Sequence, residues 1–152
     1  MKALVQRVSE GSVLIEGENY LAEIGKGFVI LLGIKTSDTV DDVIFIADKC
    51  CNLRIFEDKN EKMNLSIKET NGEILLVSQF TLYGDSQKGN RPSFTEAAKP
   101  EIAIPLYEKF IERLKQNLGE TKIKTGIFGA MMNVKIFNDG PVTIMIESNP
   151  KQ

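Results

Sequence analysis

Short segments of alternating or continuous hydrophobic residues run along most of the chain, and this pattern predicts β-strands. The most apolar segment, residues 27–33, has hydrophobic side chains at consecutive positions, so we expect a central strand covered on both faces. The other expected strands are residues 2–8, 12–16, 20–24, 73–83, 131–137 and 142–148. Turn-forming residues separate several of them, namely Glu10-Gly11, Gly17-Glu18-Asn19 and Asn138-Asp139-Gly140-Pro141.

Two segments show helical spacing instead. Residues 39–52 follow Asp38, which we expect to be the N-cap of the first helix. The second helix ends near Gly119 and begins at Pro100 or at Pro105, since either proline suits a first helical turn. Its apolar positions are Leu106, Tyr107, Phe110, Ile111, Leu114 and Leu118. We therefore predict an α+β fold with an antiparallel or mixed, barrel-like sheet and two main helices.

The composition narrows the possible chemistry. The length suits one domain, residues 1–152, because no repeat or flexible linker divides the chain. There is no histidine, which excludes Ser-His-Asp and Cys-His nucleophilic sites, imidazole bases and histidine-ligated zinc. The adjacent Cys50 and Cys51 lack the further soft ligands that a structural metal site needs. We expect them to be core residues in a reducing cytosol, and we expect no metal or cofactor.

Membrane insertion and secretion are not expected either. The N-terminal residues lack an apolar block followed by a small-residue cleavage site. The longest apolar run, residues 28–34, is far shorter than the ~20 residues of a membrane helix. We expect a cytoplasmic protein without membrane contact.

Charge is unevenly distributed, although the formal net charge is only −2. Residues 1–75 carry nine positive and thirteen negative side chains, a net of −4, whereas residues 86–135 carry nine positive and five negative, a net of +4. The basic half suits contact with a phosphate backbone. A solvated helix with Lys/Glu pairs has the same pattern, and charge alone favours that second interpretation.

The first candidate for chemistry is the segment Val77 to Leu82 at the end of a buried strand. Ser78, Gln79 and Thr81 would present hydroxyl and amide groups, together with backbone N–H donors, at a pocket wall, as an oxyanion site requires. The alternative is an edge strand with alternating polar and apolar side chains, and the pattern alone favours this alternative.

The second candidate is Asn138 to Thr143, which also has the composition of an ordinary hairpin turn. Pro141 is unusual there because it withholds a donor at the head of a strand, and an X-Pro bond is where a cis peptide costs little. A cis Gly140-Pro141 bond would turn two carbonyls the same way. Two aligned acceptors beside a rigid ring would test the stereochemistry of a bound α-carbon.

Two loops complete the candidates. Residues 84–94 combine Lys88 and Arg91 with Phe94, which suits a single-stranded nucleic acid end, although an ordinary loop has a similar composition. Residues 126–132 lack the spacing of a P-loop. They either approach a ligand closely or pack their methionines into the core, and the pattern favours packing.

Together these segments resemble the D-aminoacyl-tRNA deacylase family, also called D-tyrosyl-tRNA deacylases. The similarity covers essentially the whole chain, with the freest divergence in residues 97–120. The matching segments are MKALVQRV at the N-terminus, KMNLS at 62–66, SQFTLYGD at 78–85, KGNRPSF at 88–94, GIFGAMMNV at 126–134 and NDGPVT at 138–143. SQFTL and NDGPVT are the two signature motifs of the family, and both are unchanged here.

The resemblance implies a homodimeric hydrolase that acts on the aminoacylated 3′ end of tRNA, with its active sites at the subunit interface. It would cleave the ester bond of D-aminoacyl-tRNA, and of mischarged glycyl-tRNA, as a proofreading step for translation. One wall of the site would consist of Ser78, Gln79, Phe80, Thr81 and Leu82. The Gly140-Pro141 pair of the partner subunit, in a cis bond, would complete the site and exclude L-aminoacyl groups.

The resemblance also suggests roles for three further residues. Phe128 and Met131 would flank the adenosine or the aminoacyl group, and Arg7 would brace the Gly-Pro turn. Thr81 is the family's candidate nucleophile, but no evident base lies near it in sequence, and an unactivated hydroxyl attacks poorly. We therefore expect the 2′-hydroxyl of the terminal adenosine to assist the attacking water, with backbone N–H groups near Phe80 and Thr81 stabilising the oxyanion.

Two other classes of function remain open at this stage. A non-catalytic module that binds RNA ends would explain the basic loop and the absence of conventional catalytic residues. A different esterase or editing domain with the same fold would keep the pocket and change the substrate.

Overall fold

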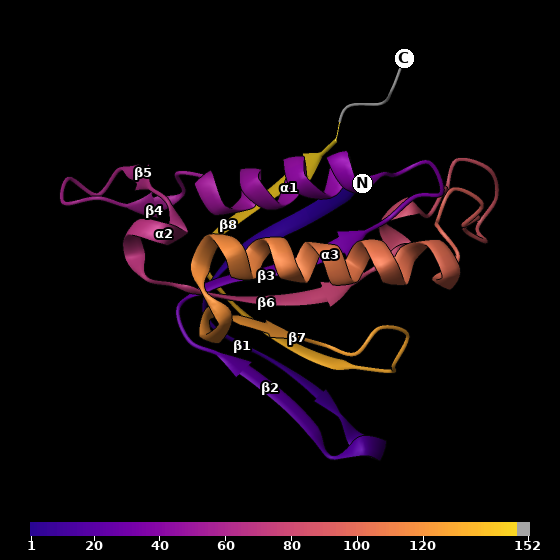
Figure 1. The fold of residues 1–152 in the computed structure, drawn as a ribbon, viewed down its shortest axis with the longest axis horizontal. Helices are drawn as coiled ribbons and strands as arrows, with labels where there is room; N and C mark the ends of the chain where they lie inside the picture. Colours follow the sequence, from indigo (N-terminus) through magenta and orange to yellow (C-terminus); the bar gives the residue numbers. More distant parts are fainter. Residues whose placement is uncertain (149–152) are drawn as a thin grey trace.

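The computed structural model describes residues 1–148 and is built around one mixed sheet with the strand order β2-β1-β3-β6-β7, while β8 also pairs with β1 (Figure 1). The strands of this sheet are β1 (Lys2–Ile15), β2 (Tyr20–Ile24), β3 (Gly27–Gly33), β6 (Glu73–Ser78), β7 (Ile123–Thr125) and β8 (Asn133–Glu147). A small hairpin is formed by β4 (Phe56–Glu57) and β5 (Met63–Leu65). The predicted domain extends to residue 152, and residues 149–152 lie outside the described part.

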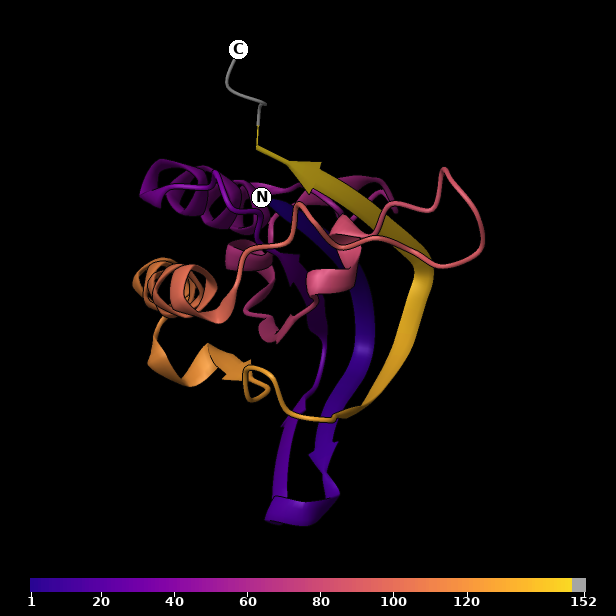
Figure 2. The same ribbon diagram turned by 90° about the vertical axis from the view of Figure 1, so that its right-hand side faces the viewer.

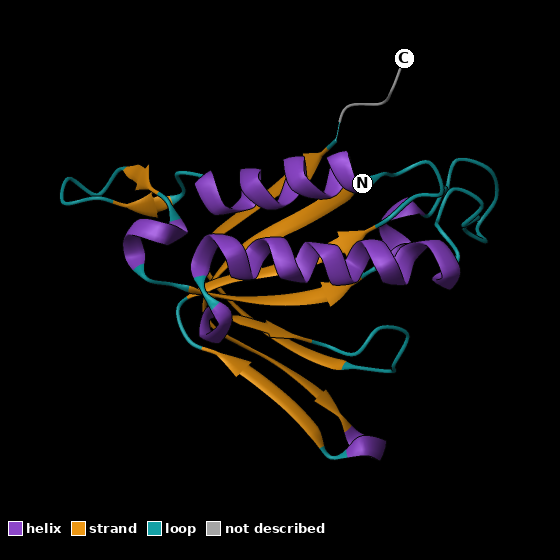
Figure 3. Cartoon of the chain, viewed as in Figure 1, coloured by secondary structure: helices purple, strands orange, loops and turns teal. Residues whose placement is uncertain are grey.

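The helices α1 (Val40–Asn52) and α3 (Pro100–Leu118) lie side by side over one face of the sheet (Figures 1 and 3). Their apolar faces pack on Phe28, Ile30 and Leu76 from the central strands, and both cysteines belong to this core as predicted. The remaining helical segments are α2 (Ile67–Thr70) and the 3₁₀ turns η1 (Glu16–Glu18), η2 (Phe80–Tyr83) and η3 (Glu120–Lys122). The helices therefore cover only one side of the sheet.

The other face of the sheet curves around a second core. Val29, Leu75 and Val77 point into this core, which residues of β1, β2 and the 127–136 segment enclose. The Tyr20 hydroxyl donates a 2.6 Å hydrogen bond to the Thr125 carbonyl and so links β2 to β7. The predicted α+β class, the mixed barrel-like sheet and the covered central strand at 27–33 are confirmed.

The predicted N-cap of the first helix is wrong, and the start of the second helix is one of the two prolines that the pattern left open. Thr39, not Asp38, is the N-cap of α1, and its N–H donates to Asp42 Oδ2 at 2.7 Å. Asp38 instead accepts hydrogen bonds from the ammonium group of Met1 and from the N–H of Lys35. The second helix begins at Pro100 and continues through Pro105.

Three of the predicted strand boundaries are wrong. No turn forms at Glu10-Gly11, because β1 continues through Gly11, whose added Cβ would lie only 2.9 Å from the Val29 side chain. The strand predicted at 73–83 ends at Ser78, and η2 follows. The expected hairpin at 138–141 is absent, since β8 is one strand that runs along β1 and bends in its middle (Figure 2).

Candidate active site

The three parallel strands β3, β6 and β7 bring two of the candidate segments to one edge of the sheet. Parallel strands have their carboxyl ends at the same edge, which is where ligands bind in many open sheets. The SQFTL segment follows β6, and the Gly126 to Met132 loop follows β7. The Gly126 N–H donates to the Leu76 carbonyl at 3.0 Å, which holds the start of this loop against β6.

The SQFTL segment is a tight turn rather than the predicted continuation of a strand. The Gln79 N–H donates to the Leu32 carbonyl at 2.7 Å, and the Leu82 N–H donates back to the Gln79 carbonyl at 3.2 Å. Gly33 lies directly beneath, since a Cβ there would be 3.2 Å from the Gln79 carbonyl oxygen and 3.0 Å from Leu82 Cβ. A glycine at the end of the apolar strand is therefore what permits this close approach.

The turn leaves two backbone donors available. Within residues 1–148, the N–H groups of Phe80 and Thr81 have no hydrogen-bond partner. Thr81 is exposed and its hydroxyl accepts a hydrogen bond from the Gln79 side-chain amide. Phe80 is 56% exposed. The turn thus leaves two adjacent N–H donors without a partner in the described residues and contains no side chain that would act as a base for Thr81.

The basic loop is connected to the turn through an aromatic contact. The rings of Phe80 and Phe94 meet edge to face with centroids 5.2 Å apart. Asp85 and Ser93 exchange two backbone hydrogen bonds, of 2.7 and 2.9 Å, that close the loop at its base. The part between them, including Lys88 and Arg91, is exposed.

The NDGPVT segment forms a bulge in β8 opposite Arg7. Gln6 pairs with Thr143 and Val8 pairs with Asn138, so Arg7 faces the whole stretch from Asp139 to Val142. The Gly140-Pro141 peptide bond is cis. Gly140 has a φ of +127°, a value that favours glycine.

Arg7 is the residue that holds this bulge. Its guanidinium donates from Nε to the Asp139 carbonyl at 3.0 Å and from Nη1 to the Ile55 carbonyl at 2.7 Å. The Asp139 carboxylate lies 3.5 Å from Nε and the Glu57 carboxylate 3.8 Å from Nη2. With its side chain 6% exposed, Arg7 joins β1, β8 and the β4–β5 hairpin inside the protein.

The two halves of the predicted site do not bond to each other within one chain. No hydrogen bond or ring contact joins Ser78, Gln79, Phe80 or Thr81 to Gly140 or Pro141 in the described residues. Phe128 packs its ring edge to face against Tyr107, with centroids 5.6 Å apart, and is partly buried. Met131 is 91% exposed.

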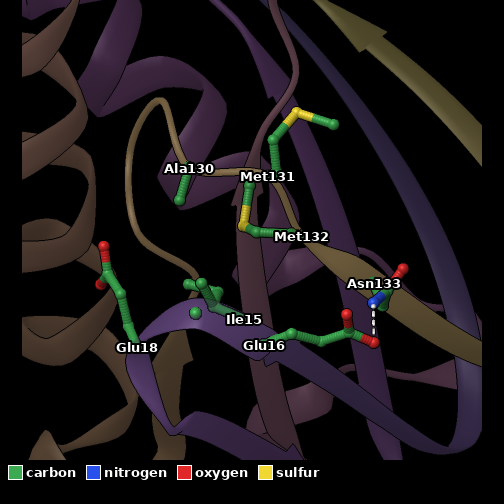
Figure 4. A pocket seen from close by; sticks show the side chains of 8 residues that line it. Ile15, Glu16, Glu18, Ala130, Met131, Met132 and Asn133 are labelled. Carbon is green, nitrogen blue, oxygen red and sulfur yellow. Dashed lines mark hydrogen bonds between the residues drawn. The ribbon is translucent and has the colours of Figure 1, made fainter.

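Met131 also borders a pocket of about 440 Å³ between the β1–β2 hairpin and the start of β8 (Figure 4). Its walls are Ile15, Glu16, Gly17, Glu18, Ala130, Met131, Met132 and Asn133. Glu16 accepts a 3.4 Å hydrogen bond from the Asn133 amide, and Met131 extends away from the two glutamates in Figure 4. None of the residues of the SQFTL turn or the β8 bulge lines this pocket.

Two contributors to the site had little or no signal in the sequence. Gly33 ends an apolar strand, and a glycine in that place is a usable hint of close backbone approach. The Ile55 carbonyl gave no signal, because any residue type supplies a carbonyl. In the part of the chain that the structure covers, no group of three or more Cys, Asp or Glu side chains is arranged to hold a metal ion. No helix among residues 1–148 is long and apolar enough to cross a membrane.

Comparisons with known proteins show which family this chain is similar to. Residues 4–147 match the family model described as D-Tyr-tRNA(Tyr) deacylase. The D-aminoacyl-tRNA deacylases of Flavobacterium psychrophilum and Cytophaga hutchinsonii are 56% and 55% identical over 152 residues, covering 100% of each chain. A solved structure described as a c-Myc DNA unwinding element binding protein has a TM-score of 0.92 and 45% identity, covering 99% of this chain and 100% of its own. A second, described as a probable eukaryotic D-amino acid tRNA deacylase, has a TM-score of 0.83 at 17% identity over 95% of this chain and 97% of its own, and supports the fold alone.

Proposed function

The chain belongs to the D-Tyr-tRNA(Tyr) deacylase family, and on this basis we propose that it hydrolyses the ester bond of D-aminoacyl-tRNA to a D-amino acid and free tRNA. The observation that carries the proposal is the SQFTL turn, whose adjacent Phe80 and Thr81 N–H groups are free to bind an oxyanion. Residues 1–152 would act as one deacylase domain. The proposal includes proofreading of translation, mischarged glycyl-tRNA as a second substrate and a cytoplasmic location, where aminoacylated tRNA is used.

Rejection of L-aminoacyl groups is the finer part of the proposal. In a homodimer, the Gly140-Pro141 segment of one subunit would complete the pocket that begins at the SQFTL turn of the other. The absence of a hydrogen bond or ring contact between the two segments, within the described residues of one chain, supports this arrangement. An L-aminoacyl side chain would meet the backbone at Gly140, whereas a D side chain points elsewhere and glycine has none.

Apolar side chains on β8 and on the strands beside it support dimerisation. Met145 of β8 lies opposite Leu4 of β1, which lies opposite Leu31 of β3, so three apolar side chains form one row. Met145 is 48% exposed and Phe137, on the same strand, is 51% exposed. Exposed apolar residues gathered along one strand are typical of an interface.

We propose that water, assisted by the substrate's own 2′-hydroxyl, attacks the ester. The exposed Thr81 hydroxyl is engaged by Gln79 and has no neighbouring base, so it would position rather than react. The Phe80 and Thr81 N–H groups would stabilise the negative charge on the carbonyl oxygen in the tetrahedral intermediate. Phe128 and Met131 would contact the terminal adenosine or the aminoacyl group.

The test is hydrolysis of matched D- and L-tyrosyl-tRNA by the purified protein. We expect release of D-tyrosine and no release of L-tyrosine, with dimers at assay concentration in analytical ultracentrifugation. Binding of both tRNAs without turnover would indicate an RNA-binding module instead. Turnover of neither tRNA, without binding, would favour another ester substrate.

A further inference from the structure

The β4–β5 hairpin and its flanks, residues 54–66, contact Arg7, which holds the β8 bulge that contains Gly140. The Arg7 guanidinium donates to the Ile55 carbonyl at 2.7 Å and, through a different nitrogen, to the Asp139 carbonyl at 3.0 Å. The same group lies 3.8 Å from the Glu57 carboxylate. The position of the hairpin therefore bears directly on where Arg7, and with it the β8 bulge, is held.

The tip of the hairpin is organised by the Asp58 carboxylate. Its Oδ1 accepts hydrogen bonds from the N–H groups of Asn60 and Lys62, at 2.8 and 3.1 Å. The Asp58 N–H donates to the Lys62 carbonyl at 2.8 Å. The backbone hydrogen bonds from Lys62 and Asn60 hold the pKa of Asp58 below its usual value, so this group is charged at neutral pH.

Asn64 connects this tip to the base of the hairpin. Its Nδ2 donates to Asp58 Oδ2 at 3.1 Å, and its Oδ1 accepts a hydrogen bond from Arg54 Nη2. The Arg54 Nε donates to the Asn64 carbonyl at 2.9 Å. Arg54 directly precedes Ile55 in the chain, so Asn64 ties the tip to the residue beside the carbonyl that anchors Arg7.

We propose that Asn64 is a positioning residue for chiral selection, acting through the hairpin, the Ile55 carbonyl and Arg7 on Gly140. This inference rests on the proposed function, in which Gly140-Pro141 excludes the L side chain. Without the Asn64 side chain, the base of the hairpin would shift and Arg7 would move with the Ile55 carbonyl. The backbone at Gly140 would then no longer be held in the position that excludes an L-aminoacyl side chain. The fold survives, because Ile55 and Phe56 remain in the core and Phe56 stacks on Phe28 with centroids 5.0 Å apart.

The experiment compares single-turnover hydrolysis of D- and L-tyrosyl-tRNA by the full chain and by Asn64→Ala. We expect the ratio of D to L rates to fall about tenfold, since small displacements in a site have effects of this size or larger. The matched control is Asn60→Ala, which removes the same side chain from the same hairpin but keeps the backbone N–H that binds Asp58; its ratio should equal that of the wild type. The exchange Asp58→Asn with Asn64→Asp restores a donor and an acceptor between the two positions and should recover most of the ratio.

An unchanged ratio in Asn64→Ala, or equal losses of both rates that follow a loss of folded protein in thermal unfolding, overturns the inference. If Asn64→Ala does not fold, Arg54→Ala breaks the same link from the exposed side and is judged by the same ratio. A wild-type enzyme that hydrolyses both tRNAs equally would overturn the proposed function itself, which is a different result from a selective wild type with an equally selective variant.

Discussion

The Nε atom of Arg7 donates a 3.0 Å hydrogen bond to the carbonyl oxygen of Asp139, 132 positions away in the sequence. The same guanidinium reaches the Ile55 carbonyl, so one buried side chain links three separate segments. Arginine suits this task because its planar fork holds several donors at fixed angles. The backbone at Gly140 is thereby held from one side by Arg7.

Replacing Arg7 with lysine should therefore impair activity more than its retained charge suggests. A lysine ammonium does not reproduce the guanidinium geometry toward both Asp139 and Ile55, so one carbonyl loses its partner. We expect D-tyrosyl-tRNA hydrolysis to fall at least about tenfold, with a stability loss of about 1–3 kcal/mol from the unpaired buried carbonyl. Single-turnover rates and urea unfolding measure the two effects. An Arg7→Lys enzyme with the wild-type rate would contradict the positioning role.

Gly140→Ala should affect the same site by crowding it. An added Cβ would lie 3.0 Å from the Val142 nitrogen and 3.1 Å from Arg7 Nη2, at a φ of +127°. The backbone conformation alone should cost about 1–3 kcal/mol. We expect a further loss of D-aminoacyl-tRNA hydrolysis, because the methyl group would push against Arg7 and Val142 and displace the backbone that borders the proposed pocket.

Gly119→Ala is the matched control for the glycine substitution. Gly119 also has a positive φ, +101°, but nothing lies within 4 Å of its added Cβ, and it follows α3 rather than lying in a candidate segment. It should lose stability to a similar extent and keep the wild-type rate. Equal activity of the two variants would mean that Gly140 does not contact the substrate.

Thr81→Ala tests the mechanism in which no protein side chain attacks. The Thr81 hydroxyl accepts a hydrogen bond from Gln79, and the proposed catalytic groups are the backbone N–H donors of the turn, which alanine retains. We expect a single-turnover rate within a few-fold of the wild type. A rate close to that of the uncatalysed reaction would restore Thr81 as the nucleophile.

The sequence predicted the fold class and the candidate segments but not how the bulge is built. Asn138 to Pro141 has the composition of a hairpin turn, and a bulge uses the same residue types. The difference is set by β1, which pairs with β8 on both sides of the bulge and places Arg7 in the gap. A local pattern cannot contain that information, because the partner lies at the other end of the chain.

The end of β6 illustrates the same limit at shorter range. Polar and apolar side chains alternate along residues 78–83 as they would in a strand. In the structure, however, the Gln79 N–H donates to the Leu32 carbonyl and the chain turns above Gly33. The turn forms because a neighbouring strand ends in glycine, which is a property of another segment. Buried segments such as residues 27–33 were predictable because their hydrophobicity alone determines their position.

The pairing of Asp48 with Arg113 should make stability depend on pH at acid values. Two hydrogen bonds of 2.7 and 2.8 Å join α1 to α3 here, and the Arg113 guanidinium holds the pKa of Asp48 below its usual value. A carboxyl whose pKa is lowered by folding stabilises the protein above its unfolded pKa and loses this contribution as the pH falls through the folded pKa. Asp48→Asn should lower the Tm by about 2–4 °C at pH 7, and the difference should shrink below about pH 4. A difference in Tm that does not depend on pH would mean that charge is not its cause.

The control is Glu112→Gln, which removes an exposed carboxyl on α3. Its Tm should differ little from that of the wild type at either pH.

Tyr83→Phe should leave stability unchanged or raise it. The Tyr83 hydroxyl is buried and has no hydrogen-bond partner within residues 1–148, and burial, followed by the charge of Asp38, raises its pKa. Lys2 Nζ lies 4.7 Å from the ring centroid, a contact that phenylalanine keeps. Removing an unpaired buried hydroxyl relieves a desolvation penalty of about 1–3 kcal/mol.

Tyr107→Phe is the contrasting case, because the Tyr107 hydroxyl donates to the Leu76 carbonyl at 3.3 Å. Its loss should cost about 0.5–1.5 kcal/mol in urea unfolding, whereas Tyr83→Phe should cost nothing. If Tyr83→Phe is the more destabilising of the two, the Tyr83 hydroxyl has a hydrogen-bond partner that does not belong to residues 1–148 of its own chain. Repeating the unfolding over a range of protein concentrations then identifies that partner, since a loss that grows with dimer formation places the hydroxyl against the second subunit.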